Sequence, residues 1–236
     1  ASMTRRFLFW LLLPVSAVQG LWLRQHARRL PGASGDRRGS IGIGKAIQLL
    51  AIGDSIIDGV GTGVMEESLP VLFARELAEA EQCQVNWHVV GESGLDVAGL
   101  LQKLEKLESE LADVILISIG VNDVTGLSST RHWRKSVICL LDRLQACWPD
   151  ARIVFAGLPP MSKFPLLPQP LRLTMGMRAP MLDNIAADLI ANRQKVGHVP
   201  TLIDPEVHSF CQDGFHPSTD SCQSWASELA RFTAGN

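Results

Sequence analysis

A serine and a histidine that lie far apart in this chain could form a nucleophile and its base. Ser55 follows the apolar run "LLAIG" and Asp54, and His216 stands in "DGFHPS", three residues after Asp213. A serine hydroxyl becomes a useful nucleophile when a neighbouring base takes its proton and a third group orients that base. A three-residue separation lets a turn hold the Asp213 carboxylate against one ring nitrogen of His216 while the other faces the serine. The sequence therefore predicts a triad of Ser55, Asp213 and His216.

Acyl transfer also needs hydrogen-bond donors aimed at the oxygen that becomes negative. The backbone N–H of Ser55 is one candidate, because a strand-to-helix turn would leave it free. Gly94 is a second, since the absence of a side chain lets a substrate approach the backbone, and the side-chain amide of Asn122 is a third. We predict that these three groups form an oxyanion hole.

The elements that would position these residues alternate along the chain between short apolar runs and longer helical patterns. The expected strands are 46–53, 84–91, 113–120, 151–158 and 200–204. The expected helices are 69–81, 97–111, 131–147, 181–195 and a last one beyond Pro217. This order predicts an α/β protein, a three-layer α/β/α sandwich around a five-stranded parallel sheet. Ligands bind such sheets beyond the carboxyl ends of the strands, where the candidate residues stand.

Four short motifs follow these expected strands in a fixed order. They are "GDS" at 53–55, "SG" at 93–94, "GVND" at 120–123 and "DGFHP" at 213–217. Together they resemble the nucleophile, glycine, GxND and DxxH blocks of the SGNH (GDSL-type) hydrolase family of esterases and lipases. The resemblance covers the chain from about residue 47 onward.

The resemblance implies a flavodoxin-like SGNH hydrolase fold and a carboxylic ester hydrolase that needs no cofactor. It implies that Ser55 is the nucleophile, that Asp213 and His216 complete the triad, and that Gly94 and Asn122 join Ser55 in the oxyanion hole. The first block departs from the family pattern, because "GDSIIDG" lacks the leucine after the serine. The glycine block is short, so Gly91 remains an alternative to Gly94.

Charge and cysteine content exclude other classes of protein. The net charge is −2, and the chain after Lys45 carries 14 basic and 23 acidic side chains, which disfavours nucleic-acid binding. The glycines of "DGVGTG" lack the lysine of a phosphate-binding loop. No metal site is expected, because the spacing of Cys211, His216 and Cys222 fits no usual zinc pattern. The cysteines, odd in number and expected to be reduced, are Cys83, Cys139, Cys147, Cys211 and Cys222.

The first 29 residues form a separate hydrophobic segment. An uncharged run from Phe7 to Leu23 is at the short limit for a spanning helix and is flanked by arginines on both sides. We expect residues 5–29 to be a membrane anchor or a surface helix that contacts a membrane. More arginines follow the run than precede it, which predicts that the domain lies on the cytoplasmic side. A secretory signal, with a secreted or periplasmic domain, and an ordinary core helix are the alternatives.

Residues 30–45, rich in Gly and Ser, are interpreted as a linker, and residues 46–236 as the hydrolase domain. A proline-rich loop from Leu158 to Leu171 is expected to shape the acyl pocket through Phe164, Leu166 and Leu167. We expect a short-chain acyl ester as the substrate. A lysophospholipid and a carbohydrate acetyl ester are alternatives, and a membrane-tethered binding module with an unused hydrolase fold is the non-enzyme alternative.

Overall fold

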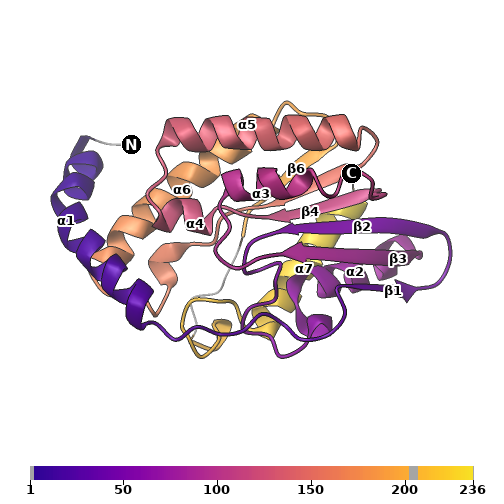
Figure 1. Cartoon of the computed structure of the whole chain (residues 1–236), viewed down its shortest axis with the longest axis horizontal. Coiled ribbons are helices and arrows are strands. Elements are labelled where there is room, and N and C mark those ends of the chain that lie inside the picture. The colour runs from indigo at the N-terminus through magenta and orange to yellow at the C-terminus, as the bar shows by residue number, and fades with distance from the viewer. Residues whose placement is uncertain (1–2, 202–206, 236) are drawn as a thin grey trace.

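The protein is built around one six-stranded sheet (Figure 1). The computed structural model describes residues 3–201 and 207–235. The spatial order of the strands is β1-β3-β2-β4-β5-β6. Their bounds are β1 (Arg38–Gly42), β2 (Ala46–Gly53), β3 (Gln84–Gly91), β4 (Val114–Ser118), β5 (Arg152–Ala156) and β6 (Val196–Val199). Strands β2 to β6 pair in parallel, which confirms the predicted α/β class and its mostly parallel sheet.

The sixth strand, β1, was not predicted, because it lies within the Gly- and Ser-rich stretch interpreted as a linker. It pairs antiparallel with β3, with Gly39 opposite Trp87. A Cβ at Gly39 would collide with the indole of Trp87, so this glycine allows the ring to lie across the strand. Cross-strand packing of this kind, rather than intrinsic propensity, forms the strand.

The last parallel strand also differs from its prediction. The sequence predicted it at 200–204, but β6 ends at Val199, and residues 202–204 lie outside the described part of the chain. Gly197 and His198 interrupt the apolar pattern of β6, and for this reason its sequence does not predict a strand. A Cβ at Gly197 would collide with the ring of Phe232 in the last helix, so helix packing explains this glycine.

Helices connect the strands and differ in places from the predicted ranges. Their bounds are α1 (Met3–His26), α2 (Leu69–Glu81), α3 (Val97–Leu104), α4 (Val121–Thr125), α5 (Thr130–Cys147), α6 (Leu171–Ile190) and α7 (Thr219–Ala234). Short 3-10 turns lie at Met65–Glu67, Met161–Lys163 and Val207–Ser209. Helix α6 begins ten residues before its predicted start at residue 181 and includes Pro180 in its interior. Helix α3 ends earlier than predicted, at Leu104.

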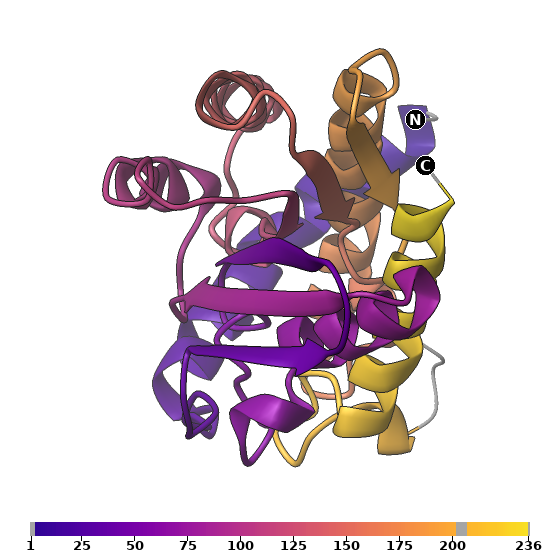
Figure 2. The same ribbon diagram turned by 90° about the vertical axis from the view of Figure 1, so that its right-hand side faces the viewer.

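The helices form two layers that bury opposite faces of the sheet (Figures 1 and 2). Helices α3, α5 and α6 cover one face, where the core includes Leu100, Leu140 and Leu182. Helices α2 and α7 cover the other, with Phe73 and Leu229 in its core. Because the central strands are buried on both sides, they read as continuous apolar runs.

Helix α1 packs beside α6 at one end of the molecule (Figure 1). The side-chain amide of Gln19 donates to the carbonyl of Gln169 at 2.8 Å and accepts from the N–H of Leu171 at 3.0 Å. Within the described chain, the segment Phe7–His26 is long and apolar enough to cross a membrane by length and composition.

Candidate active site

Ser55 stands in the turn that directly follows β2. Gly53, the last residue of β2, has φ +159°, and a Cβ there would collide with the carbonyl of Ser118 on β4. The next N–H, that of Asp54, donates to the same carbonyl at 3.1 Å, and the N–H of Val60 donates to the carbonyl of Ser55 at 2.9 Å. These backbone bonds hold the serine at the carboxyl edge of the sheet.

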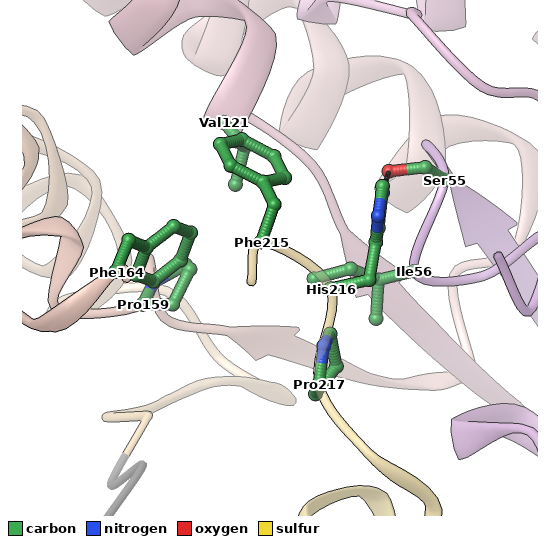
Figure 3. Close-up of a pocket in the computed structure, with 8 residues that line it drawn as sticks. All are labelled: Ser55, Ile56, Val121, Pro159, Phe164, Phe215, His216 and Pro217. Atoms are coloured by element: carbon green, nitrogen blue, oxygen red, sulfur yellow. Dashed lines mark hydrogen bonds between the residues drawn. The ribbon is translucent and has the colours of Figure 1, made fainter. Parts of the chain in front are cut away.

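The structure brings Ser55, His216 and Asp213 together. His216 Nε2 lies 3.0 Å from Ser55 Oγ, and His216 Nδ1 lies 2.6 Å from Asp213 Oδ2. Figure 3 shows the Ser55 hydroxyl and the His216 ring pointing toward each other. Since the carboxylate only accepts hydrogen bonds, Nδ1 carries a proton and Nε2 is left to accept the serine proton.

The loop that carries the histidine is held by its own acid. Asp213 Oδ1 accepts hydrogen bonds from the N–H groups of Phe215 at 2.9 Å and His216 at 3.0 Å. The same carboxylate therefore closes the turn and orients the His216 ring. Gly214 has φ +65°, a conformation that favours glycine, and its carbonyl accepts the N–H of Leu166 at 3.0 Å. The loop therefore docks on the proline-rich segment.

Electrostatics keep the Asp213 carboxylate ionised. Its burial is the largest single influence and by itself raises the pKa. The hydrogen bonds from His216 and from the backbone N–H groups of Phe215 and His216, with the nearby imidazole charge, outweigh burial and hold the pKa below its ordinary value. An ionised carboxylate at this point stabilises an imidazolium on His216.

Asp54 lies beside the nucleophile in a different environment. Its Oδ1 accepts the N–H of Ile56 at 3.1 Å, while its buried Oδ2 has no hydrogen-bond partner within the described chain. Burial raises the pKa of Asp54 to about 7, against the lowering effects of the Ile56 N–H and the His216 charge.

The three predicted oxyanion-hole donors, at Ser55, Gly94 and Asn122, each have an N–H available in the structure. The N–H groups of Ser55 and Gly94 donate no hydrogen bond to any described residue. Gly94 has φ +91° and open space where a Cβ would stand. Asn122 lies in the first turn of α4, and its Nδ2 donates one hydrogen to the carbonyl of Leu95 at 2.7 Å, leaving its other hydrogen available. Gly91 is different, because a Cβ there would collide with the backbone of Asp58.

A small cavity of ≈ 10 Å³ opens beside Ser55 and His216, which is about the room one water molecule needs. Phe164 and Phe215 pack edge to face, with ring centroids 5.1 Å apart, and close its far side (Figure 3). The lining residues are Ser55, Ile56, Val121, Pro159, Phe164, Phe215, His216 and Pro217.

The three residues predicted to shape the acyl pocket separate in the structure. Phe164 and Leu167 are both buried in the same core cluster, but only Phe164 lines the cavity, and the N–H of Leu166 donates to the carbonyl of Gly214. The prediction missed Val121 and Phe215 of the lining. Both lie within the motifs at 120–123 and 213–217, next to Asn122 and His216, and this position was the available signal.

No three His, Cys, Asp or Glu side chains of the described chain lie close enough to hold a metal ion. His216 is engaged with Ser55 and Asp213, and the Cys211 thiol donates to the carbonyl of Pro217 at 3.1 Å. The described cysteines are all free thiols.

Residues 51–223 match the GDSL-like lipase/acylhydrolase family. That range contains all four sequence motifs. The chain is 27% identical over 187 residues to the GDSL-like esterase Rv1075c of Mycobacterium tuberculosis. The alignment covers 73% of this chain but 57% of that protein's length.

Solved structures share the fold at low sequence identity. A lipase, Lip_vut3, from a goat rumen metagenome superposes with a TM-score of 0.67 at 20% identity, over 80% of this chain and 97% of the other. A carbohydrate esterase family 2 enzyme with a carbohydrate binding domain, from Corynascus thermopiles (Myceliophthora fergusii), gives a TM-score of 0.65 at 16% identity. The superposition covers 83% of this chain and 67% of the other.

Proposed function

Because the chain belongs to the GDSL-like lipase/acylhydrolase family, we propose that it is a carboxylic ester hydrolase in which Ser55 is the nucleophile, His216 the base and Asp213 the orienting acid. The observation that carries the proposal is the continuous hydrogen-bonded path from Ser55 Oγ through the His216 ring to the Asp213 carboxylate, with contacts of 3.0 Å and 2.6 Å.

In the first step, Ser55 Oγ attacks the ester carbonyl carbon while its proton moves to His216 Nε2. The carbonyl oxygen becomes negative and receives hydrogen bonds from the N–H groups of Ser55 and Gly94 and from the Asn122 amide. The free N–H groups of Ser55 and Gly94 and the second amide hydrogen of Asn122 support this assignment. The tetrahedral intermediate then expels the alcohol, which takes the proton from His216.

In the second step, water attacks the acyl-enzyme. His216 Nε2 accepts a proton from the water, and the same donors hold the new oxyanion. Collapse of this intermediate returns the proton to Ser55 Oγ and releases the carboxylic acid. Asp213 keeps its charge throughout and stabilises the imidazolium in both steps.

Replacement of the nucleophile tests the proposal. The Ser55→Ala variant is expected to hydrolyse p-nitrophenyl acetate slower by several orders of magnitude, as loss of a triad nucleophile usually does. Ser93→Ala, an exposed serine before Gly94, is the matched control and should retain turnover. A fluorophosphonate should label the wild type and not the Ser55→Ala variant. Near-normal turnover by Ser55→Ala would contradict Ser55 as the nucleophile, whereas no turnover and no labelling of the wild type would favour the binding-module alternative.

The cavity supports a short acyl group as the preferred substrate feature. Phe164, Phe215 and Val121 leave space beside Ser55 for little more than a methyl group. An acetyl ester fits this restriction, and the alcohol portion would lie outside the cavity. The structural likeness to a carbohydrate esterase makes a carbohydrate acetyl ester a second candidate, and a lysophospholipid, with its long acyl chain, fits less well.

Enlargement of the cavity tests the acyl preference. Phe164→Leu should raise the rate on p-nitrophenyl butyrate relative to the acetate by roughly 10- to 200-fold, the discrimination that one methylene can contribute in an apolar pocket. Leu166→Ala is the matched control from the same segment, which does not line the cavity and should leave the ratio unchanged. A wild-type preference for long acyl chains would contradict the proposed restriction.

A further inference from the structure

Helix α1 has two opposite apolar faces, and only one of them contacts the protein. Its exposed large side chains fall within an arc of about 140° when successive residues are spaced at 100°. We call this arc the outer stripe, and its members are Met3, Phe7, Trp10, Leu11, Val15, Val18, Leu21 and Trp22. An exposed apolar surface of this continuity marks an interaction site.

The opposite face of α1 is attached to the domain. Ser16 is 1% exposed, and Leu23 packs against the core cluster that includes α6. Gln19 is hydrogen-bonded to Gln169 and Leu171, at the start of α6. The outer stripe therefore lies on the opposite side of α1 from these contacts, and Figure 1 shows that α1 forms one end of the molecule.

The carboxyl-terminal half of α1 also borders the rim of the candidate active site. The segment it binds, ending at Leu171, begins near Phe164, which lines the cavity. Past the helix, Arg28 Nη1 donates to Gln212 Oε1 at 2.9 Å, one residue before Asp213. Helix α1 and the residues directly after it thus contact both segments that carry lining residues of the cavity.

We propose that α1 lies in the plane of an anionic lipid bilayer, with its outer stripe among the acyl chains and the active-site rim at the same surface. The substrates are then short-chain acyl esters of amphiphilic alcohols that partition into the membrane. This substrate class rests on the proposed ester hydrolysis, whereas the orientation of α1 does not.

The composition of α1 and its surroundings favours a lipid surface as the occupant. Two tryptophans, Trp10 and Trp22, lie in the outer stripe, and indoles are enriched where membrane meets water. Arg24 and Arg29 are exposed at the carboxyl-terminal end, where they can contact anionic headgroups. The helix is about 36 Å long at 1.5 Å per residue and would present this stripe along its length.

A spanning orientation conflicts with the contacts of α1. If α1 crossed the bilayer with α6 still attached, the hydrocarbon would receive the charged groups of α6, including Arg172, Asp183 and Asp188. If α1 left α6, the hydrogen bonds of Gln19 would be lost and the polar side chains of Ser16 and Gln19 would face lipid. An in-plane helix keeps every contact.

Site-specific photo-crosslinking of the full chain tests the orientation. Benzoylphenylalanine is placed at Leu11, Val18 or Trp22 in the outer stripe and at Leu12 or Leu23 on the inner face. Each variant is irradiated with vesicles of phosphatidylcholine and phosphatidylglycerol, and with phosphatidylcholine vesicles as a comparison. Lipid adducts are expected at the three outer positions, more with the anionic lipid, and crosslinks within the chain at the inner ones.

Other crosslinking patterns would overturn the orientation. Lipid adducts at all five positions would mean that α1 spans the bilayer. No lipid adduct at any position, or crosslinks from Val18 to a second copy of the chain, would mean that the outer stripe binds something other than lipid.

An activity comparison tests the substrate class separately. Leu11→Gln combined with Val18→Gln should slow hydrolysis of hexadecyl acetate in vesicles at least about tenfold, because both side chains lose their apolar transfer free energy. Hydrolysis of dissolved p-nitrophenyl acetate should be unchanged, and the exposed Gln25→Ala serves as control. Equal rates on hexadecyl acetate in variant and wild type, or an equal fall on both esters, would contradict a membrane-supplied substrate. Failure of the wild type on both esters would instead overturn the ester hydrolysis, with the crosslinking result still standing.

Discussion

At the scale of single residues, Asp54 has a carboxyl group in a buried environment that disfavours its ionised form. It is fully buried, and one of its oxygens has no partner among the described residues. Its neighbour Ser55 needs the turn that the Asp54 Oδ1 bond to Ile56 closes. Because burial raises its pKa to about 7, Asp54 is substantially protonated at neutral pH. The residue therefore supports the nucleophile structurally while making the fold sensitive to pH.

The sign of that sensitivity is fixed by the pKa, which lies above the ordinary value of 3.8. Between pH 4 and about 7 the unfolded chain releases this proton more readily than the folded one, so rising pH lowers the free energy of unfolding. Asp54→Asn removes the titration. The free energy of unfolding of the variant minus that of the wild type should rise across this range, by at most about 4 kcal/mol, and level off above it.

Urea unfolding of both proteins at pH 5, 6 and 8 measures this difference. The titration of groups common to the two proteins cancels in this difference. A loss of stability caused by the amide of the Asp54→Asn variant itself does not depend on pH, so it would shift the difference equally at all three pH values. A difference that stays constant from pH 5 to pH 8 would show that Asp54 is ionised throughout.

At the scale of elements, α4 ties two candidate donor loops into one unit. Asn122 donates to the carbonyl of Leu95, and Asp123 Oδ2 accepts the N–H of Val97 at 3.0 Å. Asp123 Oδ1 accepts the Ser128 hydroxyl at 3.0 Å. Burial raises the pKa of Asp123, against the lowering effect of these bonds. The loop that carries Gly94 is thereby fixed relative to Asn122, as preorganised electrostatic stabilisation requires.

Asn122→Ala is expected to lower kcat for p-nitrophenyl acetate by about 10²–10³, the usual cost of one lost oxyanion donor. Asp123→Asn is the matched comparison, because it weakens the same loop contacts but keeps the Asn122 amide. It should lower kcat much less. Equal losses in the two variants would mean that Asn122 acts as a tether alone.

Elements with regular patterns were predictable, and those shaped by tertiary packing were not. Strands β2 and β3 and helix α2 have the predicted bounds, because their apolar periodicity is uninterrupted. Strands β1 and β6 contain Gly39 and Gly197, whose role appears only with Trp87 and Phe232 in place.

The candidate site shows the same division. The motif order predicted that Ser55, Asp213 and His216 would meet, and the structure brings them within hydrogen-bonding distance; their catalytic roles remain predictions. The residues that line the cavity were harder to predict, because Phe164 and Leu167 are both apolar and near each other in sequence. Only the packing decides which faces Ser55.

At the scale of the whole molecule, the attachment of α1 to α6 joins the amino-terminal helix to the catalytic body. Gln19→Ala removes two hydrogen bonds to the backbone and leaves the N–H of Leu171 and the carbonyl of Gln169 without that partner. The free energy of unfolding should fall by about 1–3 kcal/mol. Urea unfolding of Gln19→Ala beside the exposed Gln25→Ala measures it, and equal values for the two variants would show that the attachment adds nothing to stability.

The connection from α1 to the sheet is bonded along its course. The N–H of Ala33 donates to the carbonyl of Asp58 at 3.0 Å, Met65 N–H to the carbonyl of Ser34 at 2.7 Å, and β1 then joins β3. The segment between α1 and the edge of the sheet is therefore held to the domain by hydrogen bonds. Because this connection and the packing on α6 both join α1 to the sheet, we expect a displacement of α1 along a surface to carry Ser55 with it.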